Sequence, residues 1–250
     1  MGRLVLVGAI GGDAQKASAL AFGAAAARAG VIVLTGGGDQ CDDEVKNAVI
    51  EGARSTGEGG RYIGILPGTS DPGGKVVWDR RANGLLIHTA LPHFVRNLIN
   101  GVTPDVLVAF GGSRGTLAEV AFALAAGKPL FFYGNGSKGS AVPRLRRNFK
   151  ECFERDDEDN VRTFLAEPLR VWPAIAGKAW TADDLLQLLE HRLGLVEDWD
   201  KSVDALVGQC IAAATMNGPL GSIGPTGFPG LPTDPESKQR FEREIEAISE

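Results

Sequence analysis

The chain has 250 residues, of which 44% are hydrophobic and 23% are charged, and its formal net charge is −5. This length corresponds to one or two domains and suffices for a core without disulfides or metals. The mildly acidic balance argues against a protein that coats nucleic acid, and the sequence contains no uncharged apolar stretch of about 18 residues that would span a membrane. We therefore expect neither nucleic acid nor a membrane as a partner.

The cysteines, histidines and glycines limit the function further. The three cysteines lie far apart without a CxxC pair, and the three histidines include no HExxH pattern. Such a set does not fit a disulfide framework or a zinc site, so we expect reduced thiols in a cytoplasmic protein with no metal and no cofactor. The 34 glycines are nearly twice the ordinary share of about 7%, which indicates tight turns and close approaches of the backbone.

Short apolar runs alternate with helical segments over the first 135 residues. Continuous apolar runs are typical of strands that are buried on both faces of a sheet. The alternation therefore predicts an α/β fold, a Rossmann-like doubly wound parallel sheet with helices on both faces. The expected strands are Leu4–Ala9, Val31–Thr35, Tyr62–Leu66, Leu85–Thr89, Val106–Phe110 and Leu130–Tyr133. The expected helices are Ala14–Ala29, Glu44–Ser55, Leu91–Gly101 and Thr116–Ala126, and Gly127 ends the last of them as a left-handed C-cap.

The rest of the chain has a weaker pattern. Its expected elements are a charged helix and loop at Arg144–Asp159, a helix that runs from a Thr181 N-cap, with Asp184 as capping-box partner, to Arg192, a helix at Lys201–Thr215 and a terminal helix at Pro235–Ser249. Glycine recurs at every third position from 218 to 230, too briefly for a triple helix, which favours a linker or polyproline II arm. We expect a Rossmann-like domain at residues 1–200 and a C-terminal helical and Gly/Pro-rich arm at residues 201–250.

The most informative stretch runs from Asp105 to Glu119, where an apolar run leads into a glycine-rich turn and a helix. Backbone N–H groups at the start of a helix have no partners within it and face the positive end of the helix dipole, which favours an anion. Gly111, Gly112 and Gly115 would let the backbone approach a phosphate closely. Thr116 would add a hydroxyl and Arg114 a charge. A tight turn that binds nothing is the alternative.

A second glycine cluster, Gly36 to Gly38, follows the expected strand at Val31–Thr35. Because the carboxyl ends of parallel strands meet at one edge of a sheet, both clusters are expected at the same edge, where open α/β sheets bind their ligands. The cluster is neither GxGxxG nor a Walker A motif. Ordinary dinucleotide and NTPase sites are therefore disfavoured, and a shared crevice is expected.

Five motifs of this region occur together. They are Thr35–Gly38, Glu51–Ala53, Ile63–Pro67, the pair Arg96-Asn97, and the turn from Gly111 to Glu119. In their order and approximate spacing they resemble the motifs of the LOG (lonely guy) and lysine decarboxylase-like group of the SLOG superfamily. The resemblance covers about residues 3–135 and extends more weakly to about residue 195.

The resemblance implies a binding site and an activity. Phosphoribohydrolases of that group cleave the N-glycosidic bond of a nucleoside 5′-monophosphate, and their proposed catalytic pair corresponds to Arg96 and Glu119 here. A carboxylate stabilises an oxocarbenium-like state or orients water, and a guanidinium holds phosphate or hydroxyl groups. From the residues alone, a salt bridge between the two, or a glutamate that ties down its own turn, remains open. The implied nucleotide-binding residues are Gly36, Gly37, Gly38, Asn97, Gly111, Gly112, Ser113, Arg114, Gly115 and Thr116.

Two departures from the group's pattern keep a second function open. Gly111-Gly112-Ser113 stands where the group has Pro-Gly-Gly, which is more similar to the branch of molybdenum-cofactor carriers, non-catalytic proteins that bind a pterin phosphate. An acidic segment, residues 39–44, also replaces the group's Gly-Val-Met. The alternative to hydrolysis is therefore a carrier or sensor of a nucleotide or pterin phosphate.

The resemblance also implies a homo-oligomer, a dimer or tetramer. The apolar faces of the helices at 91–101 and 117–126 would lie either in the core or at a two-fold interface. The arm at residues 218–250 is a second candidate, laid along a partner subunit. His88 and His93 flank a helix start near the expected crevice, and neither receives a role.

Overall fold

The computed structural model describes residues 4–12, 15–37, 44–57, 60–68, 75–79, 83–134, 140–153 and 160–216. Gly38, most of the acidic segment 39–44, the glycine-rich stretch 218–232 and the expected terminal helix 235–249 lie outside these residues. Within them, no helix is both long and apolar enough to cross a membrane.

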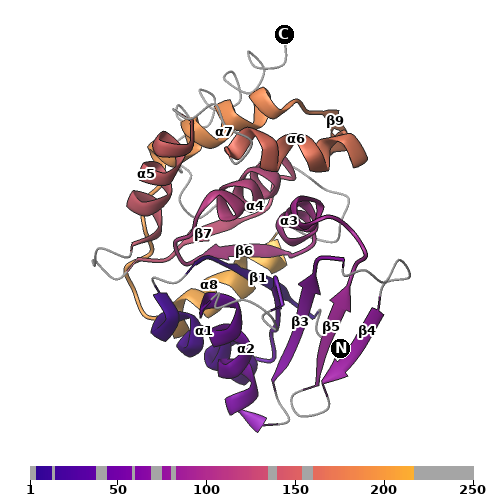
Figure 1. Cartoon of the computed structure of the whole chain (residues 1–250). Coiled ribbons are helices and arrows are strands. Elements are labelled where there is room, and N and C mark those ends of the chain that lie inside the picture. The colour runs from indigo at the N-terminus through magenta and orange to yellow at the C-terminus, as the bar shows by residue number, and fades with distance from the viewer. Residues whose placement is uncertain are drawn as a thin grey trace.

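The described part of the chain is built on a seven-stranded sheet in the order β4-β5-β3-β2-β1-β6-β7 (Figure 1). All six expected strands are present and run parallel, which confirms the predicted α/β fold. They are β1 (Leu6–Ile10), β2 (Ile32–Thr35), β3 (Arg61–Leu66), β5 (Gly84–His88), β6 (Val106–Ala109) and β7 (Leu130–Phe132). The sequence analysis did not include β4 (Lys75–Asp79), which pairs antiparallel with β5 at the sheet edge.

Helices cover both faces of the sheet, as Figure 1 shows. One face carries α1, α2 and α8, and the other carries α3 and α4, with α5, α6 and α7 packed over α4. The helices are α1 (Lys16–Arg28), α2 (Glu44–Ser55), α3 (His93–Val102), α4 (Arg114–Ala125), α5 (Ala141–Phe153), α6 (Val161–Val171), α7 (Ala182–Leu195) and α8 (Val203–Met216). The sequence analysis also lacked α6 and the small pair of strands β8 (Ala174–Ile175) and β9 (Lys178–Ala179).

Alternate residues of the central strands enter two apolar clusters, one on each side of the sheet. In β6, Val106 and Val108 belong to the cluster that includes residues of α1 and α8, whereas Leu107 and Ala109 belong to the cluster below α4. This is the period of two that a strand imposes on its side chains. Val95 and Leu98, on the apolar face of α3, are only 3% and 1% exposed. Core packing therefore uses that face within one subunit.

The strand order reverses beside β1, which pairs with β2 on one side and with β6 on the other. Strands β2, β3 and β5 follow β1 in the sheet towards one edge. Helix α3 then crosses back, so that β6 pairs with the other side of β1. The amide of Leu6 also donates a hydrogen bond to the Asp105 carboxylate over 2.9 Å, which aligns the two strands. Ligands of open α/β sheets bind at such a reversal, beyond the carboxyl ends of the strands.

Candidate functional site

Two glycine loops meet at this reversal, one after β1 and one after β6. Gly11, Gly111 and Gly112 have φ angles of +152°, +90° and +136°, which residues with side chains rarely adopt. A Cβ atom at Gly12 would lie 3.6 Å from Gly112 Cα, an ordinary van der Waals distance, so the two loops lie side by side. The φ angles therefore favour glycine in both loops.

Helix α4 begins directly after the second loop, at Arg114, two residues earlier than expected. Ser113 is its N-cap residue but makes no side-chain capping bond. Gly115 and Thr116 consequently lie in the first helical turn, where backbone N–H groups have no partners within the helix. A Cβ atom at Gly112 would overlap the Thr116 side chain, so the hydroxyl of Thr116 lies against this loop. The turn has the expected features of an anion cradle.

The loop after β2 lies on the other side of β1 from the loop after β6. Gly37 has a φ angle of +64°, and a Cβ atom there would lie 2.8 Å from Leu66 Cγ. A Cβ atom at Gly36 would lie 2.6 Å from Lys46 Cε and 3.2 Å from Arg96 Nη1. Two basic side chains, from α2 and α3, therefore border this loop.

Two consecutive residues of α3 lie between the loop after β2 and the first turn of α4. Arg96 donates a hydrogen bond from Nη1 to the Gly36 carbonyl over 3.1 Å. Asn97 points towards the first turn of α4, because its Nδ2 lies 3.8 Å from the position of a Cβ atom at Gly115. Both side chains are buried, with exposed fractions of 4% and 1%. The structure thus places these two expected site residues between the loop after β2 and the first turn of α4.

Several buried donor groups around the crevice make no hydrogen bond with the described residues. They are Arg96 Nε, Asn97 Nδ2, Gln15 Nε2 at the start of α1, and the hydroxyl of Thr35 at the end of β2. A buried polar group without a partner costs about 1–3 kcal/mol. A bound ligand with several acceptor oxygens would recover this cost.

Glu119 lies deeper, between α3 and α4. It is 4% exposed, and its Oε1 accepts a hydrogen bond from Asn100 Nδ2 over 2.8 Å. The helices approach closely here, because a Cβ atom at Gly101 would lie 2.6 Å from the Glu119 carbonyl oxygen. The neighbouring helix α3 therefore fixes the orientation of this carboxylate.

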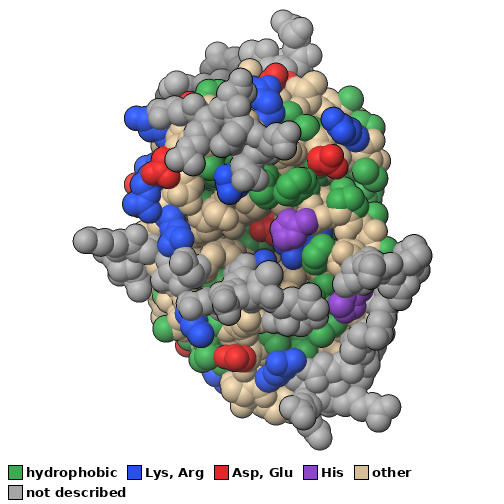
Figure 2. All heavy atoms as spheres, in the orientation of Figure 1, with side chains coloured by type: hydrophobic (Ala, Val, Ile, Leu, Met, Phe, Trp, Pro, Cys, Tyr) green, Lys and Arg blue, Asp and Glu red, His purple; other side chains and the backbone are tan. Residues whose placement is uncertain are grey.

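The crevice is electropositive near the β2 loop. Burial lowers the pKa of His93 from 6.5 to about 4, and the charges of Arg96 and Lys46 add to this shift. The His93 Nε2 atom lies 3.4 Å from Arg96 Nη2, where a neutral imidazole nitrogen accepts a hydrogen bond from the guanidinium. On the face shown in Figure 2, a histidine lies in a central hollow with acidic and basic side chains beneath it, where α3 and α4 lie in Figure 1.

The sequence analysis missed three polar residues of this region. It gave His93 no role, and it did not consider Lys46 or Asn148, which donates a hydrogen bond from Nδ2 to the Gly112 carbonyl. None of the three belongs to a recognisable motif. Their positions depend on the packing of α2, α3 and α5 against the loops, which one sequence does not reveal.

Comparison with known proteins identifies the family. The family model described as the SLOG cluster4 family matches residues 4–163. The chain belongs to the SLOG cluster4 family. This membership confirms the resemblance to the SLOG superfamily that the motifs indicated.

Solved structures similar to this SLOG cluster4 protein include two proteins whose names refer to the molybdenum cofactor. The molybdenum cofactor carrier protein from Chlamydomonas reinhardtii is 33% identical, covers 60% of this chain and 84% of its own, and has a TM-score of 0.45. The molybdenum cofactor binding protein from Rippkaea orientalis is 29% identical over 52% of this chain and 77% of its own, with a TM-score of 0.42. TM1055, a structural genomics target, is 22% identical over 75% of this chain and 99% of its own, with a TM-score of 0.45. A search of curated proteins gives no significant match.

Proposed function

We propose that this SLOG cluster4 protein binds a phosphorylated nucleotide or pterin in the crevice between the loops after β1, β2 and β6. The observation that carries the proposal is the pair Arg96 and Asn97. These consecutive buried residues reach the loop after β2 and the first turn of α4, and they hold N–H groups without partners among the described residues. A phosphate ester supplies the acceptor oxygens that such donors need.

The phosphate would lie against the first turn of α4. There the backbone N–H groups of residues 114–116 and the hydroxyl of Thr116 would donate to its oxygens, while Gly112 and Gly115 leave the space. Asn97 would donate from the α3 side. Arg96, held by Gly36, would contact the sugar hydroxyls or the ring at the β2 side.

A titration with phosphorylated and dephosphorylated ligands tests this proposal. AMP, GMP and a pterin phosphate would each be titrated beside the dephosphorylated form by calorimetry. Thr116→Ala should weaken binding of the phosphorylated ligand by about 1 kcal/mol, the value of one hydrogen bond. Gly115→Val should abolish binding and leave the circular dichroism spectrum unchanged. Full-strength binding by Gly115→Val would refute the assignment of the cradle.

A hydrolytic function is a second candidate, favoured by the buried and oriented carboxylate of Glu119. In this reaction water adds to the anomeric carbon as the N-glycosidic bond breaks, and the products are the free base and ribose 5-phosphate. Glu119 would stabilise the developing cation or orient the water, and Arg96 would hold the ribose hydroxyl groups.

Analysis of the reaction products distinguishes a hydrolase from a non-catalytic carrier or sensor. If the protein is a hydrolase, Glu119→Gln should retain AMP binding and lose turnover, because the amide has a similar shape but no charge. Asn100→Ala, which removes one hydrogen bond from the Glu119 carboxylate but keeps the carboxylate, should lower turnover less. Tight AMP binding by the wild-type protein without release of adenine would exclude the hydrolase and leave the carrier or sensor.

We also propose that the protein is a homo-oligomer, a dimer or tetramer, and this proposal has a test of its own. Light scattering after size-exclusion chromatography gives the mass directly. A monomer at the concentrations used for binding would refute it.

A further inference from the structure

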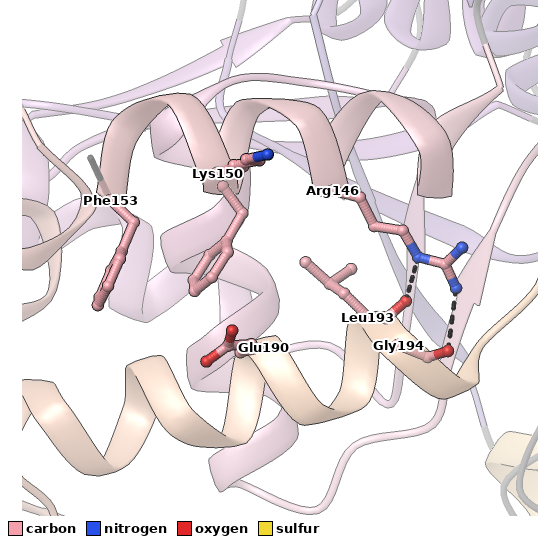
Figure 3. A pocket seen from close by; sticks show the side chains of 7 residues that line it. Arg146, Lys150, Phe153, Glu190, Leu193 and Gly194 are labelled. Carbon is pink, nitrogen blue, oxygen red and sulfur yellow. Dashed lines mark hydrogen bonds between the residues drawn. The ribbon is translucent and has the colours of Figure 1, made fainter. Parts of the chain in front are cut away.

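Helix α5 carries three arginines in its first two turns, Arg144, Arg146 and Arg147. Arg146 lies in the hollow between α5 and α7, where it donates to the carbonyls of Leu193, Gly194 and Val196. Figure 3 shows its guanidinium over the end of α7, with Lys150 and Phe153 further along α5. Cations stabilise the carbonyl end of a helix. Arg146 therefore has a structural task, and Arg147 is exposed to solvent.

Arg144 is directed differently, towards the strand reversal. Its Nη2 atom lies 3.9 Å from the position that a Cβ atom would take at Gly12. That same position is 3.6 Å from Gly112 Cα. The guanidinium of Arg144 consequently lies beside the junction of the loops after β1 and β6.

The geometry of α5 keeps Arg144 in this place. One helical turn later, Asn148 donates to the Gly112 carbonyl, so residues i and i+4 of α5 face the same loop. The first turn of α5 is anchored as well, since the Val142 amide donates to Asp198 over 3.0 Å and the Ala141 amide donates to the Tyr133 carbonyl over 3.1 Å. Arg144 is itself half-buried. The backbone from which the Arg144 side chain extends is therefore held in place.

The crevice thus has basic groups at two ends. Arg96 and Lys46 border the loop after β2, and Arg144 borders the loops after β1 and β6. Neighbouring strands lie about 4.8 Å apart, so the β2 and β6 loops are separated by two strand spacings, about 10 Å. This is the length of a nucleoside or pterin with its phosphate at one end.

We propose that Arg144 is a specificity-determining residue that binds the phosphate group of the ligand, on the side of the cradle opposite to α3. This inference rests on the proposed function and adds a residue and an orientation to it. A phosphate at the first turn of α4 receives N–H donors from one side only, and a guanidinium contacts two of the remaining oxygens at once. The ring end of the ligand then points towards Arg96.

The test compares Arg144→Gln with the matched control Arg147→Gln, an exposed arginine of the same helix. Calorimetry would give the affinity of each variant for AMP, GMP and a pterin phosphate, and for the same compounds without phosphate. Arg144→Gln should weaken binding of the phosphorylated forms by about 10-fold to 100-fold, as expected for a lost charge-assisted hydrogen bond. Binding of the dephosphorylated forms should be unchanged, and Arg147→Gln should resemble the wild type.

A second variant guards against a folding defect. Arg144→Lys keeps the charge but loses the fork of donors, so its affinity for phosphorylated forms should lie between those of the wild type and Arg144→Gln. Equal losses for phosphorylated and dephosphorylated ligands would overturn the inference, because they would indicate a damaged loop. Unchanged binding by Arg144→Gln, with tight binding by the wild type, would overturn it and leave the proposed function intact. If the wild type binds no compound of the panel, the proposed function fails, and the inference fails with it.

Discussion

The guanidinium of Arg96 donates to the backbone carbonyl of Gly36 over 3.1 Å, although 60 residues separate the two positions. This bond joins α3 to the loop after β2. A lysine at position 96 would carry the same charge but would lack the planar fork that lets arginine contact the Gly36 carbonyl and His93 together.

Arg96→Lys should therefore weaken ligand binding more than it weakens the fold. We expect a loss of about 10-fold or more in affinity for the phosphorylated ligand, the scale of one charge-assisted hydrogen bond. Calorimetric titration and thermal melting of the same preparation measure both effects. A lysine variant that binds as tightly as the wild type would show that the ligand does not use the fork.

The ionisation of His93 offers a test by nuclear magnetic resonance. Its pKa is lowered to about 4 by burial and by the charges of Arg96 and Lys46. Lys46→Gln removes one of these charges and should raise the pKa of His93. Titration of the imidazole signals measures this change directly, and an unaltered pKa would show that Lys46 lies too far away to act.

The same shift predicts how stability depends on pH. The unfolded chain binds a proton at His93 near the ordinary value of 6.5, whereas the folded chain binds it only near 4. The free energy of unfolding should therefore fall as the pH decreases through this window. Urea unfolding at several pH values tests the sign, and His93→Gln should reduce the slope.

Asp198 holds the start of α5 through the Val142 amide. Burial raises the pKa of this carboxyl, while bonds from the backbone of residues 141 and 142 and the charge of Arg146 oppose the shift. Asp198→Asn retains an acceptor oxygen and removes the buried charge, so at neutral pH it should be as stable as the wild type or more so. Asp198→Ala loses the acceptor and should cost about 1 kcal/mol.

The pH dependence of these Asp198 variants has a defined sign. Because the pKa is raised on folding, the wild-type contribution to stability is present at low pH and decreases as the pH rises through the folded pKa. Asp198→Asn should lack this decrease. Parallel thermal melts in acidic and neutral buffers provide the comparison, and equal slopes would contradict the assignment.

Glycines that permit close helix packing should differ sharply from an exposed one. A Cβ atom at Gly23 would overlap the Val49 carbonyl, and one at Gly52 would overlap the Leu20 carbonyl, so α1 and α2 touch at both positions. Gly23→Ala should destabilise the protein by about 1–3 kcal/mol. Gly208 lies within α8 with no atom within 4 Å of a Cβ position, and Gly208→Ala should stabilise by about 0.5–1 kcal/mol. Denaturant midpoints of the two variants should shift in opposite directions.

Local signals account for most of what the sequence analysis predicted correctly. Gly127 has a φ angle of +63° and donates to the Leu124 carbonyl, which confirms the C-cap of α4. Thr181 and Asp184 form the expected capping box at the start of α7. The parallel strands follow equally from short apolar runs, because burial on both faces leaves a continuous pattern.

Elements without such signals were missed. Helix α6 contains Pro168 in its interior, and an interior proline argues against a helix because it removes one backbone hydrogen bond. Strand β4 begins with Lys75 and ends with Asp79, and its Val76 is 63% exposed, so it lacks the continuous apolar run of a buried strand. Both depend on neighbours that are distant in the sequence.

Of the candidate site, the sequence indicated only the glycine turns and the Arg-Asn pair. Those residues are adjacent in the sequence or belong to a recognisable motif. Arg144, Lys46 and His93 come to the crevice from three different helices. Their side chains are ordinary in composition, and only the packing of each helix on the sheet gives them their positions.

The pairing of β1 with β6 has a kinetic consequence for ligand binding. It joins Val7 to Val106, across about a hundred residues, whereas β1 and β2 are joined by a single short helix. Pairings of such sequence separation require the closure of a long loop, which is slow to form. A ligand that touches both the β1 and β6 loops binds only after this closure. It should therefore lengthen the lifetime of the folded state while leaving the refolding rate unchanged.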